Sequence, residues 1–329
     1  MKGNTDVMIL GTGRAVPERI LTNADLEKIV ETSDSWIVER TGIRERRVAE
    51  PGEPLSLFAS KAAQAALADA GLEAESIDLI ILGTVTGDMK FPATACFVQE
   101  QIGAKNAVAF DVSAACSGFL YALQIASGLM AGGRYRHALI IGGEVLTSMV
   151  NWADRDTCVL FGDGAGAVVL GPAEGDRGIL GTSIGSDGAF SSLLYNPGCG
   201  SLNPPTEENV RAQLHTIHMA GREVFRNAVV AMTKSLKKVL EEANLQPDDL
   251  KLLIPHQANL RIIEAVAKRF GIPMDKSYVN VDRFGNTSAA SIPIALDEVC
   301  RQGLAGPGDL IGMVTFGAGF TWAAGVVRL

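Results

Sequence analysis

The sequence of 329 residues has no long hydrophobic run, few cysteines and no excess of positive charge. No stretch approaches the roughly 18 consecutive apolar residues that a membrane-spanning helix requires. The first ten residues contain one lysine and an apolar stretch of strand length, which is no export signal. The five cysteines are scattered and odd in number, which argues against a disulfide framework or a metal cluster. The sequence therefore predicts a cytoplasmic protein without a bound metal ion or a membrane anchor.

Signals for nucleic acid and nucleotide cofactors are also absent. The formal net charge of -8 argues against general nucleic-acid binding. Gly11-Thr12-Gly13 is followed by Val16 where a dinucleotide fingerprint requires a third glycine, and residues 161–166 lack the lysine and Ser/Thr of a phosphate loop. We therefore expect no cofactor. With 47% hydrophobic residues, the chain is long enough to bury a large core in about two domains.

Alternating strand and helix patterns predict an α/β fold, and several motifs occur twice. Ile9-Leu10-Gly11-Thr12 recurs as Ile179-Leu180-Gly181-Thr182, and the helix end and strand of residues 70–81 recur in residues 243–254. Residues 109–116 occupy the place that residues 278–286 occupy in the second half. The Gly- and charge-rich segment 171–178 separates the copies, and we divide the chain into halves 1–174 and 175–329. Two like halves packed about a pseudo-twofold axis would bring the loops after equivalent strands together.

Cys116 lies between a predicted buried strand, residues 107–112, and a predicted helix, residues 118–130. The N-terminus of a helix presents unpaired N–H groups and a positive dipole end, which favour thiolate over thiol. Cys116 is therefore a candidate nucleophile. The alternative is an inert, buried cysteine.

His256 and Asn286 lie at similar junctions in the second half. His256 follows the strand 250–255, and Asn286 stands in Gly285-Asn286-Thr287-Ser288. Taken singly, the histidine could be structural and the asparagine a helix N-cap. The proposed duplication predicts that both converge with Cys116.

Five segments together resemble one family, the β-ketoacyl-acyl carrier protein synthase III condensing enzymes that start bacterial fatty acid synthesis. They are residues 111–118, 161–166, 255–261, 285–290 and 316–322. The resemblance runs from about Val7 to Leu329. It implies a thiolase-type fold of five αβαβα layers, built from two pseudo-twofold-related halves, and a homodimer.

The resemblance also implies a mechanism. Cys116 accepts the acyl group of an acyl-coenzyme A primer, and malonyl-acyl carrier protein then binds and loses carbon dioxide. His256 and Asn286 stabilise the enolate oxygen, while the backbone N–H groups of Cys116 and Ala318 stabilise the oxyanion of the acyl thioester. The family commonly has glycine where this chain has Ala318, so a positive φ there would be costly. The last loop carries no second cysteine of the kind that thiolases use.

By the same resemblance, five residues contact coenzyme A. Trp36 and Arg155 would hold the adenine between an indole and a guanidinium. The others line the coenzyme A or pantetheine tunnel: Arg40, Thr41 and Asn259. Without the resemblance, Trp36 could be a core residue, and Arg40 and Arg155 could be surface charges.

An acidic synthase that binds an acidic carrier protein needs local positive charge at its tunnel mouth. Arg222 and Arg226, one turn apart on a helix starting near Gly221, and Arg261 are candidates, although a solvated helix face is the alternative. Phe91 matches the family residue that crosses the dimer interface and closes the partner's acyl pocket.

Three other functions stay open from the sequence. A relative of the same fold could join longer or branched acyl chains in secondary metabolism. A catalytically silent scaffold could bind acyl thioesters without reacting. A Cys-His-Asn hydrolase is the third, although its local cysteine signatures are absent.

Overall fold

The computed structural model describes residues 6–329, and the first half of the chain forms a five-stranded sheet in the order β1-β7-β6-β4-β5. Every residue of β4 is buried, as expected for an interior strand of a sheet that is covered on both faces. The strands are β1 (Val7–Ala15), β4 (Leu79–Gly83), β5 (Val108–Val112), β6 (Ala138–Val145) and β7 (Asp163–Pro172).

The second half forms a four-stranded sheet in the order β11-β12-β13-β8. Its parallel and antiparallel strand pairs follow one another as in the first sheet. In the first sheet β1 runs antiparallel to β7 and β4 runs parallel to β6. In the second, β8 runs antiparallel to β13 and β11 runs parallel to β12. The strands are β8 (Gly178–Ser186), β11 (Leu252–Pro255), β12 (Leu310–Gly317) and β13 (Thr321–Arg328).

The predicted duplication is confirmed by a shared irregularity. The pairing of β1 skips Leu10, and the pairing of β8 skips Leu180, which is the same leucine of the repeated Ile-Leu-Gly-Thr motif. The fifth strand is where the copies differ. Its counterpart in the second half is reduced to a single parallel bridge between Leu253 and Ser277.

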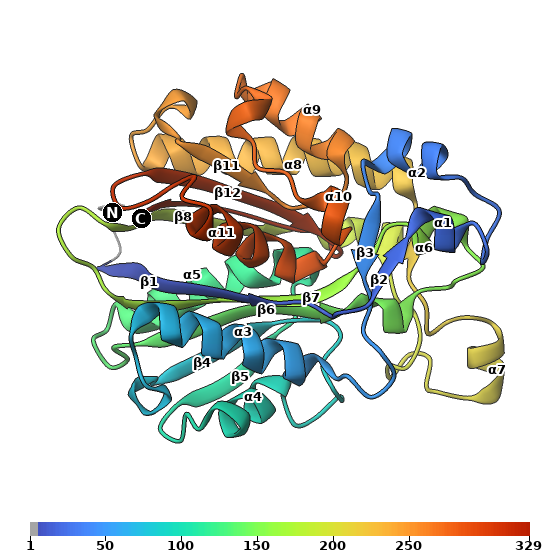
Figure 1. Ribbon diagram of the computed structural model, residues 1–329, viewed down its shortest axis with the longest axis horizontal. Helices are drawn as coiled ribbons and strands as arrows, with labels where there is room; N and C mark the ends of the chain where they lie inside the picture. Colours follow the sequence, from blue (N-terminus) through green and yellow to red (C-terminus); the bar gives the residue numbers. More distant parts are fainter. Residues whose placement is uncertain (1–5) are drawn as a thin grey trace.

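Three layers of helices enclose the two sheets, which gives the five-layer arrangement seen in Figure 1. Helices α3 (Leu55–Ala70) and α4 (Thr94–Ile102) cover the outer face of the first sheet. Helices α5 (Gly118–Met130) and α11 (Ser291–Arg301) lie between the sheets and share one apolar core with both. Helices α8 (Gly221–Glu242) and α9 (Leu260–Phe270) cover the second sheet. The predicted thiolase-type fold is therefore confirmed.

Short elements gather at one end of the sheets, on the right in Figure 1. They are β2 (Ile20–Thr22), α1 (Asn23–Leu26), α2 (Asp34–Thr41), β3 (Glu45–Arg47), α6 (Arg155–Cys158), β9 (Leu194–Tyr195), α7 (Glu207–Arg211), β10 (His218–Met219) and α10 (Val281–Phe284). Five of them, β2, α1, α2, α6 and α10, contribute buried residues to one apolar cluster, whereas α7 has no buried residue.

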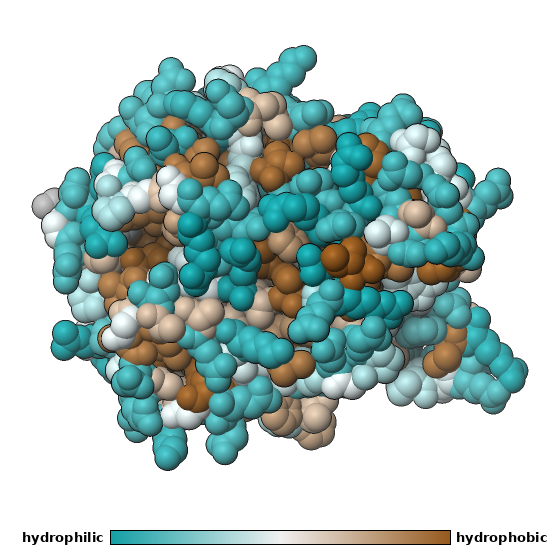
Figure 2. All heavy atoms as spheres, viewed as in Figure 1, coloured by the Kyte–Doolittle hydropathy of each residue, from teal (hydrophilic) through white to brown (hydrophobic). Residues whose placement is uncertain are grey.

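The prediction that residues 107–112 form a buried strand is wrong in one respect. The strand is β5, but it forms the edge of its sheet, and 48% of the Val108 surface is exposed. An edge strand has a row of unpaired backbone groups, because no second strand covers it within residues 6–329. Elsewhere the face in Figure 2 is largely hydrophilic, with apolar side chains in scattered groups. None of the helices within residues 6–329 has both the length and the apolar composition needed to cross a bilayer.

Candidate active site

Cys116 lies on a short 3-10 turn, Ala115–Ser117, that leads directly into α5. The turn needs a positive φ of 47° at Ala115, an unusual conformation for a residue with a side chain. Residues of the second half hold it in place. The Thr321 hydroxyl donates to the Ala114 carbonyl at 2.9 Å, and the Thr315 hydroxyl donates to Ser117 Oγ at 3.2 Å.

His256 directly follows β11, and its backbone N–H donates to the Val314 carbonyl at 2.8 Å. Only 3% of its surface is exposed, and burial lowers the pKa of its imidazole to about 3. The ring is therefore neutral at physiological pH. Its Nδ1 lies 2.7 Å from the Ser291 hydroxyl on α11, which leaves Nε2 as the free ring nitrogen. With Ser291 as the donor, Nε2 carries the proton and can itself donate.

Asn286 is held in a sharp turn between the two halves. The preceding residue, Gly285, has a φ of 64°, and a Cβ there would lie 2.8 Å from the Leu160 carbonyl oxygen, so only glycine fits. The Asn286 N–H donates to that same carbonyl at 2.8 Å. Its side-chain Oδ1 accepts from the Ser288 N–H at 2.9 Å, which leaves the two Nδ2 protons for other partners. The asparagine thus makes a cap-like bond and still presents a donor.

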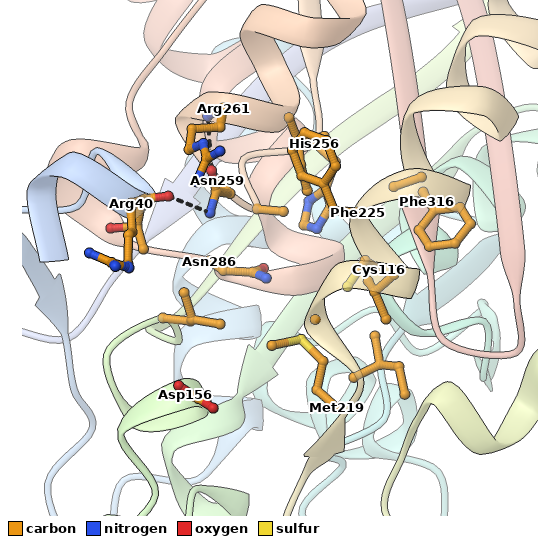
Figure 3. Close-up of a pocket in the computed structure, with 18 of the residues that line it drawn as sticks. Arg40, Cys116, Asp156, Met219, Phe225, His256, Asn259, Arg261, Asn286 and Phe316 are labelled. Atoms are coloured by element: carbon orange, nitrogen blue, oxygen red, sulfur yellow. Dashed lines mark hydrogen bonds between the residues drawn. The ribbon is translucent and has the colours of Figure 1, made fainter. Parts of the chain in front are cut away.

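The structure brings these three residues together at one cavity of about 620 Å³. Figure 3 shows the His256 ring above the Cys116 sulfur and the Asn286 carboxamide directed toward the same space. The loops can meet because glycines allow close backbone contact. A Cβ at Gly83 would lie 2.4 Å from the Gly118 carbonyl carbon, and one at Gly142 would lie 2.2 Å from the Ala289 oxygen.

The expectation that Cys116 favours the thiolate is wrong for this structure. Burial raises the pKa of the Cys116 thiol to about 12, and the nearby Glu144 carboxylate also raises it. A hydrogen bond with the Ser288 side chain acts in the opposite direction but is the weaker effect. The residue does sit at a helix start, but burial is the largest influence on this pKa and favours the thiol. The resting side chain is therefore a thiol.

The loop after β12 lies against the Cys116 turn. A Cβ at Gly317 would lie 2.7 Å from the Cys116 nitrogen. Ala318 does not take a positive φ, which falls on Gly319 at 136° instead. The expected penalty for alanine at position 318 is therefore absent.

At the outer end of the cavity, two guanidinium groups already lie over the Trp36 ring. Arg40 is 4.5 Å and Arg155 is 4.6 Å from its centroid. The cavity is lined by Trp36, Arg40, Thr41 and Asn259. Arg155 lies over the Trp36 ring but does not line the cavity. The Thr41 hydroxyl is committed to the Ile37 carbonyl at 2.7 Å, and Asn259 Nδ2 donates to the Arg40 carbonyl at 3.1 Å.

The predicted docking and dimer residues are all on the surface. Arg222 and Arg261 are exposed and line the cavity, whereas Arg226 is exposed beside it without lining it. Phe91 is 84% exposed and lies outside the cavity of its own chain.

Sequence reasoning missed the apolar wall of the cavity. Helix α8 contributes Val224, Phe225 and Ala228 along one side. Their helical spacing is equally typical of a helix face that packs in the hydrophobic core. The sequence therefore gave no separate indication of a tunnel. Within residues 6–329, no cluster of three or more His, Cys, Asp or Glu side chains is arranged to hold a metal ion.

Comparisons with known proteins identify the family. Residues 110–188 match the family described as 3-oxoacyl-[acyl-carrier-protein (ACP)] synthase III, and residues 240–329 match the C-terminal part of the same family. A relative from Caldanaerobacter subterraneus, named beta-ketoacyl-[acyl-carrier-protein] synthase III, is 55% identical over 97% of both chains.

Solved structures show the same similarity. The 3-oxoacyl-[acyl-carrier-protein] synthase III of Aquifex aeolicus is 48% identical, with a TM-score of 0.92 over 98% of this chain and 100% of that one. The priming beta-ketosynthase of the R1128 polyketide pathway is 35% identical, with a TM-score of 0.92 over 99% of this chain and 97% of that one. This chain therefore belongs to the β-ketoacyl-acyl carrier protein synthase III family of condensing enzymes.

Proposed function

We propose that the protein condenses an acyl-coenzyme A primer with malonyl-acyl carrier protein and so initiates fatty acid synthesis. The observation that carries this proposal is the meeting of a thiol, a neutral imidazole and a carboxamide at one cavity, with Cys116 from one half and His256 and Asn286 from the other. Family membership supplies the reaction class, which is acyl transfer followed by carbon–carbon bond formation.

In the first half-reaction, the Cys116 sulfur attacks the carbonyl carbon of the acyl thioester, and the bond to the coenzyme A sulfur breaks. Negative charge collects on the carbonyl oxygen. The backbone N–H groups of Cys116 and Ala318 are the proposed donors, and the contact between Gly317 and the Cys116 turn supports this. Coenzyme A leaves, and the acyl group stays on Cys116.

In the second half-reaction, malonyl-acyl carrier protein loses carbon dioxide, and the electrons of the broken bond form an enolate. His256 Nε2 and Asn286 Nδ2 donate to the enolate oxygen. A neutral imidazole suits this task, because a charged one would be acidic enough to protonate and quench the carbanion. The carbanion attacks the acyl carbon, and the Cys116 sulfur leaves.

We further propose a cytoplasmic homodimer that needs no additional cofactor, since acyl-coenzyme A is a substrate. The uncovered edge of β5 and the 84% exposed Phe91 support the dimer, because both are apolar or unpaired features that a second copy would cover. In such a dimer Phe91 would close the acyl pocket of the partner subunit. Arg222, Arg226 and Arg261 would attract the acidic carrier protein.

A condensing enzyme of secondary metabolism is the second candidate, because the polyketide priming synthase shares the fold at 35% identity. The higher identities, 55% and 48%, are to enzymes named beta-ketoacyl- or 3-oxoacyl-[acyl-carrier-protein] synthase III. A panel of acyl-coenzyme A primers, from acetyl through branched to medium chain, separates the two. A preference for short primers supports the first proposal, and a preference for longer chains supports the second.

The mechanism is tested by trapping the acyl-enzyme with acyl-coenzyme A and locating it by mass spectrometry. We expect an adduct on Cys116 that is lost in Cys116→Ser. We expect His256→Ala and Asn286→Ala to form the adduct but to fail in decarboxylating malonyl-acyl carrier protein. Absence of any adduct on wild-type Cys116 would contradict the proposal and leave a silent acyl-thioester-binding scaffold.

A further inference from the structure

Arg46, in β3, is fully buried close to the turn that carries Asn286, and neither half-reaction uses it. Within residues 6–329, its guanidinium donates only to neutral oxygens. They are the Leu21 carbonyl at 3.0 Å, Asn23 Oδ1 at 2.9 Å and the Val159 carbonyl at 2.8 Å. A buried cation without a carboxylate partner costs stability, which an apolar side chain of similar length would not.

The direction of the guanidinium is fixed by Asn23. Its Nδ2 donates to the Ile43 carbonyl at 2.8 Å and to Asp34 Oδ1 at 2.8 Å, so its Oδ1 stays directed at Arg46 Nη1. The second nitrogen, Nη2, is then held toward the Val159 carbonyl. Burial lowers the pKa of Arg46 to about 10, so the side chain remains charged at neutral pH. Hydrogen bonds from a charged donor are stronger than those from a neutral one.

The carbonyl that Arg46 holds begins the segment that fixes Asn286. The next carbonyl, of Leu160, accepts from the Asn286 N–H at 2.8 Å. Two residues farther, the Gly162 N–H donates to the Asn286 carbonyl at 3.1 Å. The segment therefore fixes the backbone of Asn286 through both its N–H and its carbonyl, and Arg46 fixes the start of the segment at Val159.

The stem of Arg46 contacts the same turn. A Cβ at Gly162 or at Gly285 would in each case lie 3.2 Å from the Arg46 Cβ. The backbone of β3 is also joined to α10, which lies beside it in Figure 1 and ends directly before Gly285. The Arg44 N–H donates to the Asp282 carbonyl at 2.9 Å. Both the guanidinium and the stem of Arg46 thus support the turn.

We propose that Arg46 is a positioning residue for the second half-reaction and holds the Asn286 carboxamide at the enolate oxygen through residues 159–162. Arg46 does not line the cavity, so it acts through Asn286 and does not touch the substrate. Cys116 and His256 are held by hydrogen bonds that do not involve these segments. The inference rests on the proposed role of Asn286 as a donor to the enolate.

Arg46→Met tests the inference, because methionine keeps an unbranched stem but removes the donors to the Leu21 and Val159 carbonyls. We expect decarboxylation of malonyl-acyl carrier protein, measured as release of radioactive carbon dioxide, to fall about tenfold to hundredfold. A displacement of about 1 Å of a catalytic group has effects of this size. Acylation of Cys116 by acyl-coenzyme A in a single turnover should change by less than about twofold, since Arg46 does not hold that turn.

A double-mutant cycle separates positioning from a general loss of structure. Asn286→Ala should leave a residual decarboxylation rate about 10²–10³ below that of the wild type. Adding Arg46→Met to Asn286→Ala should lower this residual rate no further, because the group that Arg46 positions is gone. Adding Arg46→Met to His256→Ala should lower the rate by the full factor seen in the wild-type background.

Arg301→Met is the matched control. Arg301 also donates to a backbone carbonyl, that of Thr12 at 3.3 Å, but lies at the far end of α11 from Ser291. Its loss should leave both half-reactions unchanged. Arg46→Lys keeps the charge but replaces the planar fork by a single nitrogen, and it provides the result if Arg46→Met fails to fold. We expect its loss in the same step, decarboxylation, and not in acylation.

The inference is wrong if Arg46→Met slows acylation and decarboxylation equally, leaves decarboxylation unchanged, or lowers the rate of Asn286→Ala further. Hydrogen exchange of the peptide that contains Asn286 gives a readout without substrate, and exchange should be faster in Arg46→Met than in the wild type. If wild-type Cys116 is not acylated and no carbon dioxide is released, the proposed function fails. Unchanged exchange in Arg46→Met would instead contradict the positioning role of Arg46 alone.

Discussion

Gly317 and Cys116 touch through their backbones: a Cβ at position 317 would lie 2.7 Å from the Cys116 nitrogen. The two residues come from different halves of the chain. The contact therefore ties the last loop of the second sheet to the turn that carries the nucleophile. Any shift of that turn moves the proposed oxyanion donor.

We predict that Gly317→Ala reduces the rate of acyl transfer by about 10²–10³, the usual effect of losing one oxyanion donor. The methyl group would meet backbone, which cannot rotate away as a side chain can. Single-turnover release of coenzyme A measures the step. Gly128→Ala is the control, because position 128 is in α5 and has open space around it, and it should leave the rate unchanged. A Gly317→Ala enzyme with the wild-type rate would contradict this account of the loop.

Much of the fold was predictable because the duplication left local traces. The repeated Ile-Leu-Gly-Thr motif marks equivalent strands, and even the skipped residues, Leu10 and Leu180, correspond. Cys116, His256 and Asn286 each follow a recognisable strand or turn, so their convergence followed from the repeat.

The electrostatics of the site was not predictable in the same way. A helix start is visible in the local sequence, but the burial that dominates the pKa of Cys116 depends on packing between the halves. The contact between Glu144 and Ser288 joins residues 144 positions apart. A single glutamate ending an apolar strand was the only sequence signal for it. The edge position of β5 likewise depends on sheet order, which the strand pattern does not contain.

The stacking site at Trp36 gives a second prediction. We expect Trp36→Leu to raise the KM for acyl-coenzyme A by roughly tenfold, since stacking of a base on an aromatic ring contributes about 1–3 kcal/mol. An acyl-pantetheine primer, which has no adenine, serves as the control on the same variant, and its KM should change little. If the KM values for both primers rise equally, Trp36 supports the fold of the cavity instead of binding adenine.

Charge on α8 gives a third prediction. Arg226 is exposed beside the cavity without lining it, so Arg226→Glu should raise the KM for malonyl-acyl carrier protein by about threefold to tenfold at low salt and less at high salt. The KM for the acyl-coenzyme A primer should stay the same. Lys234→Glu makes the same charge change farther along the helix and is the control. If both variants raise the KM for malonyl-acyl carrier protein equally, or if Arg226→Glu raises the KM for both substrates equally, Arg226 is not part of the docking surface.

The neutrality of His256 gives a prediction about stability. Its pKa is lowered from 6.5 to about 3, so below pH 6.5 the unfolded chain binds a proton that the folded protein does not. Stability is therefore lost as the pH falls through this window, by up to about 1.4 kcal/mol per pH unit from this group. Glu144 acts in the opposite sense between pH 4.5 and about 7, because its raised pKa lets the folded protein keep a proton that the unfolded chain releases.

The His256→Gln variant lacks the contribution of His256 to the pH dependence of stability and keeps that of Glu144. As the pH falls from 6.5 to 4.5, the unfolding free energy of the variant should therefore increase relative to that of the wild type by up to about 1.4 kcal/mol per pH unit. Urea unfolding of both proteins at several pH values in this range measures the difference. The comparison cancels every other titrating group that the two proteins share. Parallel stability curves would mean that the folded protein protonates His256 as readily as the unfolded chain does, and the imidazole could then not serve as a neutral donor to the enolate.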